Sequence, residues 1–271
     1  MAIQWKTGLI SQGPCQLEYK FTSHPGKPWM VFLHGFGQDF RAFEPMYTVL
    51  NEHFSFLSLN LFFHGESSLE GTGPLLPEDW KVLIEDLFEK LEIDKALWMA
   101  YSMGAKFTLT SYQLVPQLFS GITILAPDGV VMNPWYGFAT QNAFGRFCLS
   151  ASLRYIPLFR YLVILLGRIG VVRPSLGKFA TGQLATRESR KLVLDVWLRF
   201  RKIWPTESIW RGHLKKDPIP VMIVLGKYDT IMSKKKFQKK REEWKEVQWL
   251  ELDAGHASLV EKFASKLAKQ L

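Results

Sequence analysis

The residues of this sequence that could do chemistry stand where apolar runs end. Ser102 closes the run ALWMAYS, Asp229 follows PVMIVLG, and His256 ends the more polar run VQWLELDAGH. A second aspartate, Asp128, follows GITILAP, so two carboxylates are candidates for one role. A serine hydroxyl becomes a nucleophile when an imidazole takes its proton, and a carboxylate can hold that imidazole in place. These residue types in this chain order indicate nucleophilic catalysis by a serine.

The residues around Ser102 are small. Ala100, Gly104 and Ala105 lie within three positions of it, in the stretch LWMAYSMGAKF. Side chains of this size permit a tight, strained turn between a strand and a helix. Two interpretations are open at this point: Ser102 simply ends a strand, or it stands on a sharp strand-to-helix turn that lifts its hydroxyl out of the sheet.

Strand-like runs alternate with helical stretches along most of the chain. Continuous apolar runs are typical of strands that are buried on both faces, as in a parallel sheet covered by helices. The strand-like runs are residues 16–23, 29–35, 54–62, 96–102, 121–127, 220–226 and 247–256, and the helical stretches are 77–91, 104–115 and 257–271. This order predicts an α/β fold with a mostly parallel, doubly wound sheet. Such a sheet gathers the residues that follow its strands at one edge.

The alternation fails between residues 128 and 212. This segment is aromatic and helical, without strand-like runs, and carries 13 Lys and Arg against 4 Asp and Glu. Its excess of nine positive charges equals the formal net charge of the whole chain, +9. Charge this local favours a separate structural unit. We predict a helical insertion over 128–212 between two parts of the core, 1–127 and 213–271.

The turn around Ser102 and the order of the strand-end residues resemble the α/β-hydrolase superfamily, in its serine hydrolase branch. The nucleophile turn of that family reads G-x-S-x-G, and its catalytic residues follow in the order serine, acid, histidine. Here the turn is Ala100-Tyr101-Ser102-Met103-Gly104, with alanine in place of the first glycine. The resemblance extends from about residue 16 to the end of the chain. It implies the α/β-hydrolase fold, with the insertion as a helical cap.

The resemblance also implies a role for each matching residue. Ser102 would be the nucleophile, His256 its base, and Asp229 the acid that orients the histidine. The backbone N–H groups of Phe36, in the stretch HGFG, and of Met103 would form the oxyanion hole. Such a site needs no metal and no cofactor.

Two parts of the implied site stay open. Some relatives carry their acid at the position of Asp128, which is the alternative to Asp229. Many relatives have D-x-x-G-x-G-x-S after the next strand, whereas residues 60–67 read NLFFHGES, so Phe63 replaces a glycine. This bulkier loop puts the shape of the substrate pocket in question and leaves the three catalytic residues as they are.

The expected activity is that of a serine hydrolase which cleaves a carboxylic ester or a related acyl compound through an acyl-enzyme. Aromatic residues early in the insertion, such as Trp135 and Phe147, favour a small-molecule acyl substrate with an apolar or aromatic part, and the basic charge is compatible with an anionic one. Two alternatives stay open. One is a hydrolase-fold protein that only binds a small ligand. The other is a lipase-like enzyme at an anionic membrane surface, docked through residues 157–174.

Composition and short motifs narrow the remaining classes. With 271 residues, 47% hydrophobic and 22% charged, the chain is neither disordered nor fibrous. The two cysteines, Cys15 and Cys148, form no CxxC pair, which argues against a zinc site or a disulfide framework. No nucleic-acid-binding motif accompanies the basic charge. Residues 1–13 lack the basic start and apolar core of a signal peptide, and this predicts a cytoplasmic protein. The oligomeric state stays open.

Overall fold

The computed structural model describes residues 3–155, 161 and 186–270. The chain divides into two compact units, each described here by itself. The larger comprises Met1–Gly71, Leu76–Val131 and Ile203–Leu271, and the smaller comprises Thr72–Leu75 and Met132–Lys202. Apart from Tyr161, the segment 157–174 that the sequence suggested for membrane docking lies outside the described residues.

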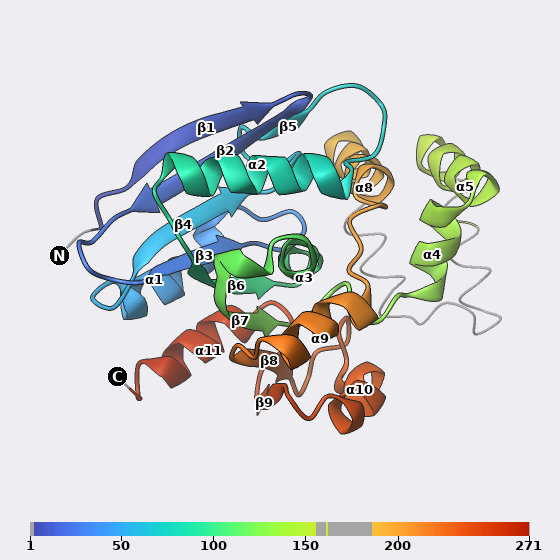
Figure 1. Cartoon of the computed structure of the whole chain (residues 1–271). Helices are drawn as coiled ribbons and strands as arrows, with labels where there is room; N and C mark the ends of the chain where they lie inside the picture. Colours follow the sequence, from blue (N-terminus) through green and yellow to red (C-terminus); the bar gives the residue numbers. More distant parts are fainter. Residues whose placement is uncertain (1–2, 156–160, 162–185, 271) are drawn as a thin grey trace. The chain divides into compact units, whose positions relative to one another are not determined.

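A nine-stranded sheet forms the centre of the larger unit (Figure 1). Its strands are β1 (Lys6–Gln12), β2 (Cys15–Thr22), β3 (Trp29–Leu33), β4 (Ser55–Asn60), β5 (Ser68–Leu69), β6 (Ala96–Tyr101), β7 (Phe119–Leu125), β8 (Val221–Gly226) and β9 (Gln248–Leu252). Their order is β1-β2-β4-β3-β6-β7-β8-β9, with β5 paired to β2. The neighbours from β4 to β9 run parallel, whereas β2 pairs antiparallel with β1, β4 and β5. The predicted mostly parallel sheet is confirmed.

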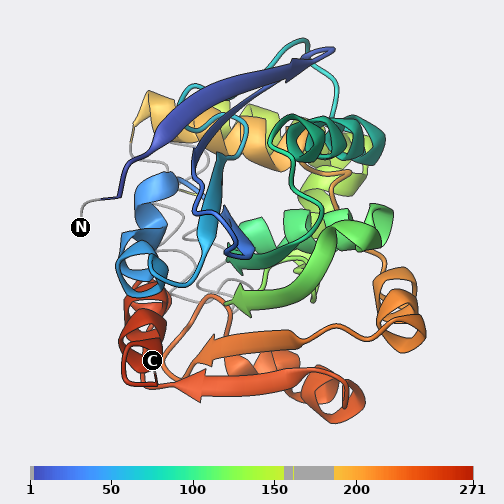
Figure 2. The ribbon, with the colours of Figure 1, turned by 60° about the vertical axis from the view of Figure 1, so that its left-hand side comes forward.

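Helices cover both faces of this sheet, which makes it doubly wound (Figure 2). The helices α1 (Glu44–Leu50) and α11 (Leu259–Leu267) pack together on one face. On the other face α3 (Gly104–Leu114) packs against both α2 (Pro77–Lys90) and α9 (Glu207–Lys216), and the short α10 (Gln238–Glu243) precedes β9. Because both faces are covered, every residue of β4 is buried. The apolar runs of the sequence therefore correspond to the strands at the centre of the sheet.

The first strand was not anticipated from the sequence. β1 is an edge strand of mostly exposed residues, so it lacks the apolar run of a buried strand. It forms a hairpin with β2, and Gly13 in the connecting turn has a φ of 54°. Glycine adopts this left-handed conformation without steric cost.

The smaller unit contains the helices α4 (Pro134–Gln141), α5 (Ala143–Arg154) and α8 (Arg187–Arg199). Side chains cap all three, since Asn133, Asn142 and Thr186 each accept a hydrogen bond from a backbone N–H in the first turn. Its main segment is shorter than the predicted insertion. α9 begins inside the predicted range 128–212 and extends beyond its end, and it belongs to the larger unit. There His213 and Thr206 hydrogen bond to Gln113 of α3.

Within the part of the chain that the structure describes, none of the helices combines the length and apolar character that a membrane crossing needs.

Candidate active site

Ser102 stands on a strained turn between β6 and α3. Its φ is 50°, a left-handed conformation that costs roughly 1–2 kcal/mol for a residue with a side chain. The small neighbours explain how this turn fits. A Cβ on Gly104 would lie 2.2 Å from the carbonyl oxygen of Leu33, so no larger residue fits there. Ala100, at the position of the first glycine, is fully buried in β6 beside Leu33 of β3.

The end of β7 holds the backbone of Ser102 on both sides. The N–H of Ser102 donates to the carbonyl of Leu125 at 2.9 Å, and its carbonyl accepts from the N–H of Asp128 at 3.2 Å. These two bonds fix the serine relative to the neighbouring strand. Ser102 as a residue is partly exposed, and its hydroxyl makes no hydrogen bond with any described residue.

The structure pairs Asp229 with His256. Asp229 follows β8 and His256 follows the adjacent β9, and the Nδ1 of His256 lies 2.7 Å from Oδ2 of Asp229. The second carboxylate oxygen accepts from the N–H groups of Ile231 and Met232, both at 2.8 Å. Burial raises the pKa of Asp229, but the hydrogen bond from His256 and the two backbone bonds outweigh it, so the net pKa lies below its ordinary value. The carboxylate is therefore ionised, and Nδ1–H of the imidazole donates to it.

Tyr101 links this pair to the serine turn. It directly precedes Ser102, and its hydroxyl donates to the backbone carbonyl of His256 at 2.8 Å. The two rings also lie close, with centroids 5.1 Å apart. The structure thus places His256 beside the turn that carries Ser102, although it joins the histidine by a hydrogen bond only to Asp229. Catalytic hydrogen bonds are often long before substrate binds.

The alternative acid, Asp128, has a different partner. Its Oδ2 lies 3.7 Å from Nζ of Lys106, whose side chain is 3% exposed in α3. The other oxygen accepts from the N–H of Gly129. Gly129 has a φ of 94°, and a Cβ there would meet the Cβ of Lys106 at 2.6 Å. The loop after β7 therefore packs closely on α3, and the structure does not bring Asp128 to His256.

Two histidines order the loop that carries Phe36. The N–H of Leu61 donates to Nε2 of His34, and the N–H of Gly37 donates to Nε2 of His64. Because each Nε2 accepts, each ring holds its proton on Nδ1, which donates to a backbone carbonyl. Burial lowers the pKa of His34 to about 3, and burial also lowers the pKa of His64. Both rings are neutral supports for the loop.

The two backbone N–H groups expected in the oxyanion hole belong to Phe36, which follows β3, and to Met103, which comes just before α3. Phe36 is partly exposed, and Met103 directly precedes the first residue of α3. No described residue accepts a hydrogen bond from either backbone N–H.

The loop after β4 departs from the pattern D-x-x-G-x-G-x-S at the first glycine of that pattern. Phe63, in place of glycine, has a φ of 68°. Gly65 keeps its glycine, and a Cβ there would lie 2.1 Å from Nδ2 of Asn60. Phe63 is partly exposed, so the bulkier loop that the sequence indicated is present with a strained residue in it.

Sequence reasoning missed Lys106 and the hydrogen bond of Tyr101. Lys106 is the only charged residue of α3, in the stretch GAKFTLTSYQL, and a lone cation in an otherwise uncharged helix is the signal that could have found it. Among the described residues, no group of three or more His, Cys, Asp or Glu side chains is arranged to hold a metal ion.

Comparison with known proteins gives one family. A sequence model of the alpha/beta hydrolase family matches residues 30–268. An uncharacterized hydrolase of Bacillus subtilis is 25% identical over 111 residues, which cover 41% of this chain and 41% of that relative. The matched stretch therefore spans less than half of the relative's length.

Solved structures share the fold. A hydrolase from Pseudomonas aeruginosa PA01 superposes with a TM-score of 0.67 at 17% identity, over 98% of this chain and 97% of that chain. Naproxen esterase (carboxylesterase NP) from Bacillus subtilis superposes with a TM-score of 0.62 at 15% identity, over 99% and 90%. At these identities the likeness establishes the architecture and leaves the substrate open.

Proposed function

Because this chain belongs to the alpha/beta hydrolase family, we propose that it is a serine hydrolase which cleaves a carboxylic ester or a related acyl compound. The observation that carries the proposal is the hydrogen bond between His256 and Asp229 beside the strained turn of Ser102. A fold hosts many chemistries, so the argument rests on these residues and not on the architecture.

The proposed reaction uses three side chains in sequence. Ser102 attacks the carbonyl carbon of the substrate while Nε2 of His256 takes the hydroxyl proton. That nitrogen is free to accept because Nδ1 of the same ring donates to ionised Asp229. The carboxylate stabilises the imidazolium that forms, and the imidazolium then protonates the leaving group. Water then attacks the carbonyl carbon of the acyl-enzyme while Nε2 of His256 takes one of its protons. The imidazolium returns that proton to the oxygen of Ser102, whose bond to the acyl carbon breaks to release the acid.

When Ser102 attacks, a negative charge develops on the carbonyl oxygen of the substrate, and hydrogen-bond donors are needed to stabilise it. The backbone N–H groups of Phe36 and Met103 are proposed for this role, since no described residue accepts from them. The neutral rings of His34 and His64 hold the loop of Phe36 by hydrogen bonds to its backbone, at Gly35 and Gly37. We propose a small acyl substrate with an apolar or aromatic part, and no cofactor.

Labelling with a fluorophosphonate probe tests the nucleophile. We expect the probe to label the wild-type protein at Ser102, and Ser102→Ala to abolish labelling. Ser68→Ala, which removes an exposed serine of β5, is the matched control and should be labelled like wild type. A wild-type protein that is folded by circular dichroism yet unlabelled would contradict the proposal and favour a ligand-binding protein. A panel of p-nitrophenyl esters of graded chain length would then define the acyl group.

A further inference from the structure

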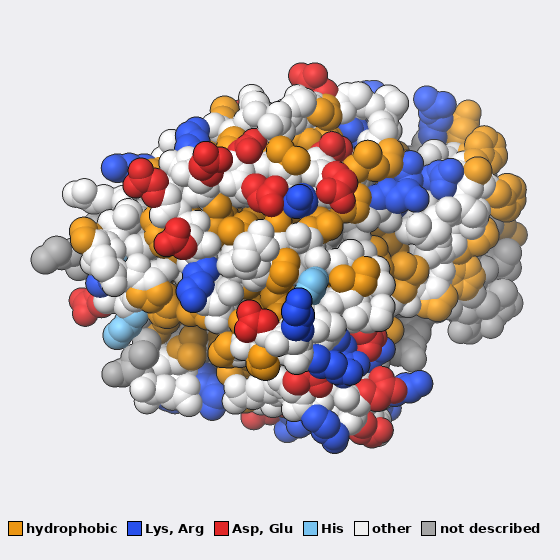
Figure 3. Space-filling view, viewed as in Figure 1, with side chains coloured by type: hydrophobic (Ala, Val, Ile, Leu, Met, Phe, Trp, Pro, Cys, Tyr) orange, Lys and Arg blue, Asp and Glu red, His pale blue; other side chains and the backbone are white. Residues whose placement is uncertain are grey.

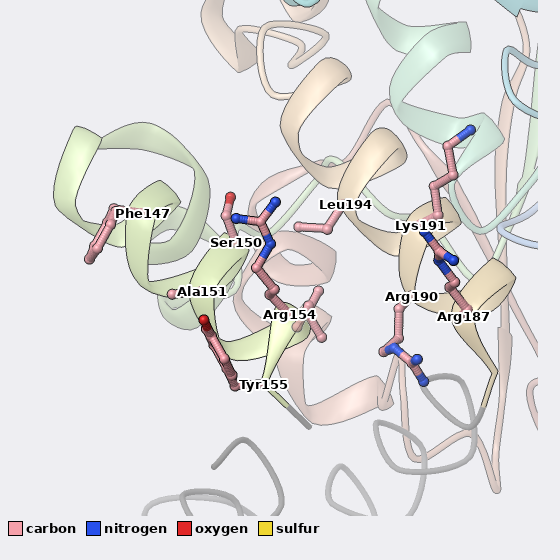
Figure 4. Close-up of a pocket in the computed structure, with 10 residues that line it drawn as sticks. Phe147, Ser150, Ala151, Arg154, Tyr155, Arg187, Arg190, Lys191 and Leu194 are labelled. Carbon is pink, nitrogen blue, oxygen red and sulfur yellow. The ribbon is translucent and has the colours of Figure 1, made fainter. Parts of the chain in front are cut away.

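Lys and Arg side chains are spread over the protein surface (Figure 3). Several of them line the groove between α5 and α8 in the smaller unit (Figure 4). There Lys191 forms an ion pair with Asp195 at 3.8 Å, and Glu188 interacts electrostatically with Arg187 and Arg190. These three cations of α8 therefore have acidic partners on their own helix.

Lys106 differs from these cations, because it is the only buried lysine among the described residues. Its side chain is 3% exposed in α3, and its Nζ lies 3.7 Å from Oδ2 of Asp128. Burying an ammonium group costs free energy even when the group is paired, and apolar residues of similar size are often as stable as a buried ion pair. Stability alone therefore does not account for this pair.

The pair lies against a strained loop, residues 126–129, which follows β7. Ala126 has a φ of 50° and Gly129 a φ of 94°. A Cβ on Gly129 would lie 2.6 Å from the Cβ of Lys106, so the loop and α3 are in direct contact. Strained residues persist only where the surrounding contacts fix them. Asp128 stands between the two strained residues, so its ion pair with Lys106 ties the loop to the helix.

The same loop contacts the turn of Ser102. The N–H of Asp128 donates to the carbonyl of Ser102 at 3.2 Å, and the N–H of Ala105 donates to the same carbonyl at 3.0 Å. The N–H of Ser102 donates to the carbonyl of Leu125, which directly precedes the loop. Ser102 is itself strained, with a φ of 50°. The loop therefore supplies one of the two hydrogen bonds that hold the serine carbonyl.

We propose that Lys106 is a positioning residue for Ser102. It acts through Asp128: the ion pair keeps the loop against the serine turn, and the loop keeps the turn in the geometry that presents the hydroxyl to the substrate. Small misplacements of a reacting group lower the rate steeply. The bond from Ala105 remains when the pair is broken, so the loss is partial. Lys106 acts in this way only if Ser102 is the nucleophile, so the inference rests on the proposed function.

Steady-state kinetics of Lys106→Met test the proposal, because methionine keeps the length of the side chain and removes its charge. We expect kcat for a p-nitrophenyl ester to fall about tenfold, with KM within twofold of wild type. Asp128→Asn is the second variant, in case Lys106→Met does not fold, and should lower kcat about threefold. In the double variant kcat should equal that of Lys106→Met alone, because both changes remove the same contact.

Ser111→Ala is the matched control. Ser111 is buried on the same helix and accepts a hydrogen bond from Nε1 of Trp80 at 2.8 Å. Its loss leaves a buried indole N–H unpaired, which destabilises the protein without changing the loop after β7. We expect the free energy of unfolding to fall, as it does in Lys106→Met, while kcat stays within twofold of wild type.

Amide hydrogen exchange of the full-length protein, followed by NMR, gives a second readout that does not depend on activity. The N–H of Asp128 should exchange at least fivefold faster in Lys106→Met than in wild type, relative to the amides of β6. In Ser111→Ala this ratio should stay within twofold of wild type. Faster exchange confined to the loop would show that the charge of Lys106 holds it.

Three outcomes would overturn the inference. They are a fall of kcat in Ser111→Ala equal to that in Lys106→Met, a change confined to KM, and unchanged relative exchange of Asp128 in Lys106→Met. A folded wild-type protein that a fluorophosphonate does not label would instead contradict the proposed function and end the catalytic part of this inference with it. The exchange of Asp128 would then decide by itself whether Lys106 holds the loop.

Discussion

Two aspartates that follow neighbouring strands of the sheet have different partners. Asp229, after β8, bonds to the imidazole of His256 at 2.7 Å, whereas Asp128, after β7, lies 3.7 Å from the ammonium of Lys106. An imidazole exchanges its proton near neutral pH, and an ammonium acts as a fixed point charge. The first pair is therefore suited to proton transfer and the second to holding a loop. At this edge of the sheet the partner, and not the strand position, determines what a carboxylate can do.

The largest expected effect separates the two carboxylates by activity. Asp229→Asn should lower kcat for a p-nitrophenyl ester by about 10⁴-fold, because the amide favours the wrong tautomer of the histidine. Asp128→Asn should stay within about tenfold of wild type, since the backbone N–H that donates to Ser102 is retained. Steady-state kinetics of the two purified variants decide the matter. The assignment of the acid is wrong if the larger loss belongs to Asp128→Asn.

A smaller effect is expected on the free energy of unfolding, to which the pair of Lys106 and Asp128 contributes. Lys106→Met keeps the length of the side chain but removes the charge beside Asp128. Breaking a fully buried pair costs about 3–5 kcal/mol, and the 28% exposure of Asp128 reduces this, so we expect the free energy of unfolding to fall by about 2 kcal/mol. Urea denaturation followed by circular dichroism measures it.

The double variant Lys106→Met/Asp128→Asn provides the control. Because it removes both charges together, it should recover part of the loss. A double variant whose loss equals the sum of the two single losses would show that the pair contributes no coupling.

Removing the hydroxyl of Tyr101 tests how much its hydrogen bond contributes to the position of His256. Tyr101→Phe removes the bond to the carbonyl of His256, a contribution of about 0.5–1.5 kcal/mol. We expect kcat to fall about three- to tenfold with KM nearly unchanged, because the histidine is positioned less well while the substrate pocket is intact. A change confined to KM would assign the ring to substrate binding.

The smallest expected effect is on the free energy of unfolding at low pH. The pKa of Asp229 is lowered in the folded protein, so its ionised form contributes stability that is present above the unfolded value of about 3.8 and is lost as the pH falls through the lower folded value. The difference in unfolding free energy between wild type and Asp229→Asn should therefore narrow below about pH 3.8. Thermal melts from pH 7 to pH 3 test this, and a difference that widens on acidification would contradict it.

Local patterns were sufficient to predict the buried parts of the fold. The runs that end at Ser102 and before Asp229 are apolar because β6 and β8 are covered on both faces. The edge strand β1 escaped prediction because its residues are mostly exposed and carry no such run. The turn of Ser102 was predictable as well, since small residues at fixed spacing are a local requirement of its geometry.

Long-range contacts could not be predicted in the same way. The hydroxyl of Tyr101 meets a carbonyl 155 positions along the chain. A lysine such as Lys106 is expected at the surface until the close approach of Gly129 is known. The choice between Asp128 and Asp229 also depends on which loop lies next to β9, and only the strand order supplies that.

The neutral histidine rings that hydrogen bond to the Phe36 loop have a consequence for spectroscopy. The chain has six histidines, and His34 keeps its proton on Nδ1 down to about pH 3. Its ¹⁵N resonances should therefore stay fixed between pH 5 and 8 and mark one tautomer throughout. They offer an internal standard in the same sample, against which the proton position on the ring of His256 can be followed by NMR as an inhibitor is added.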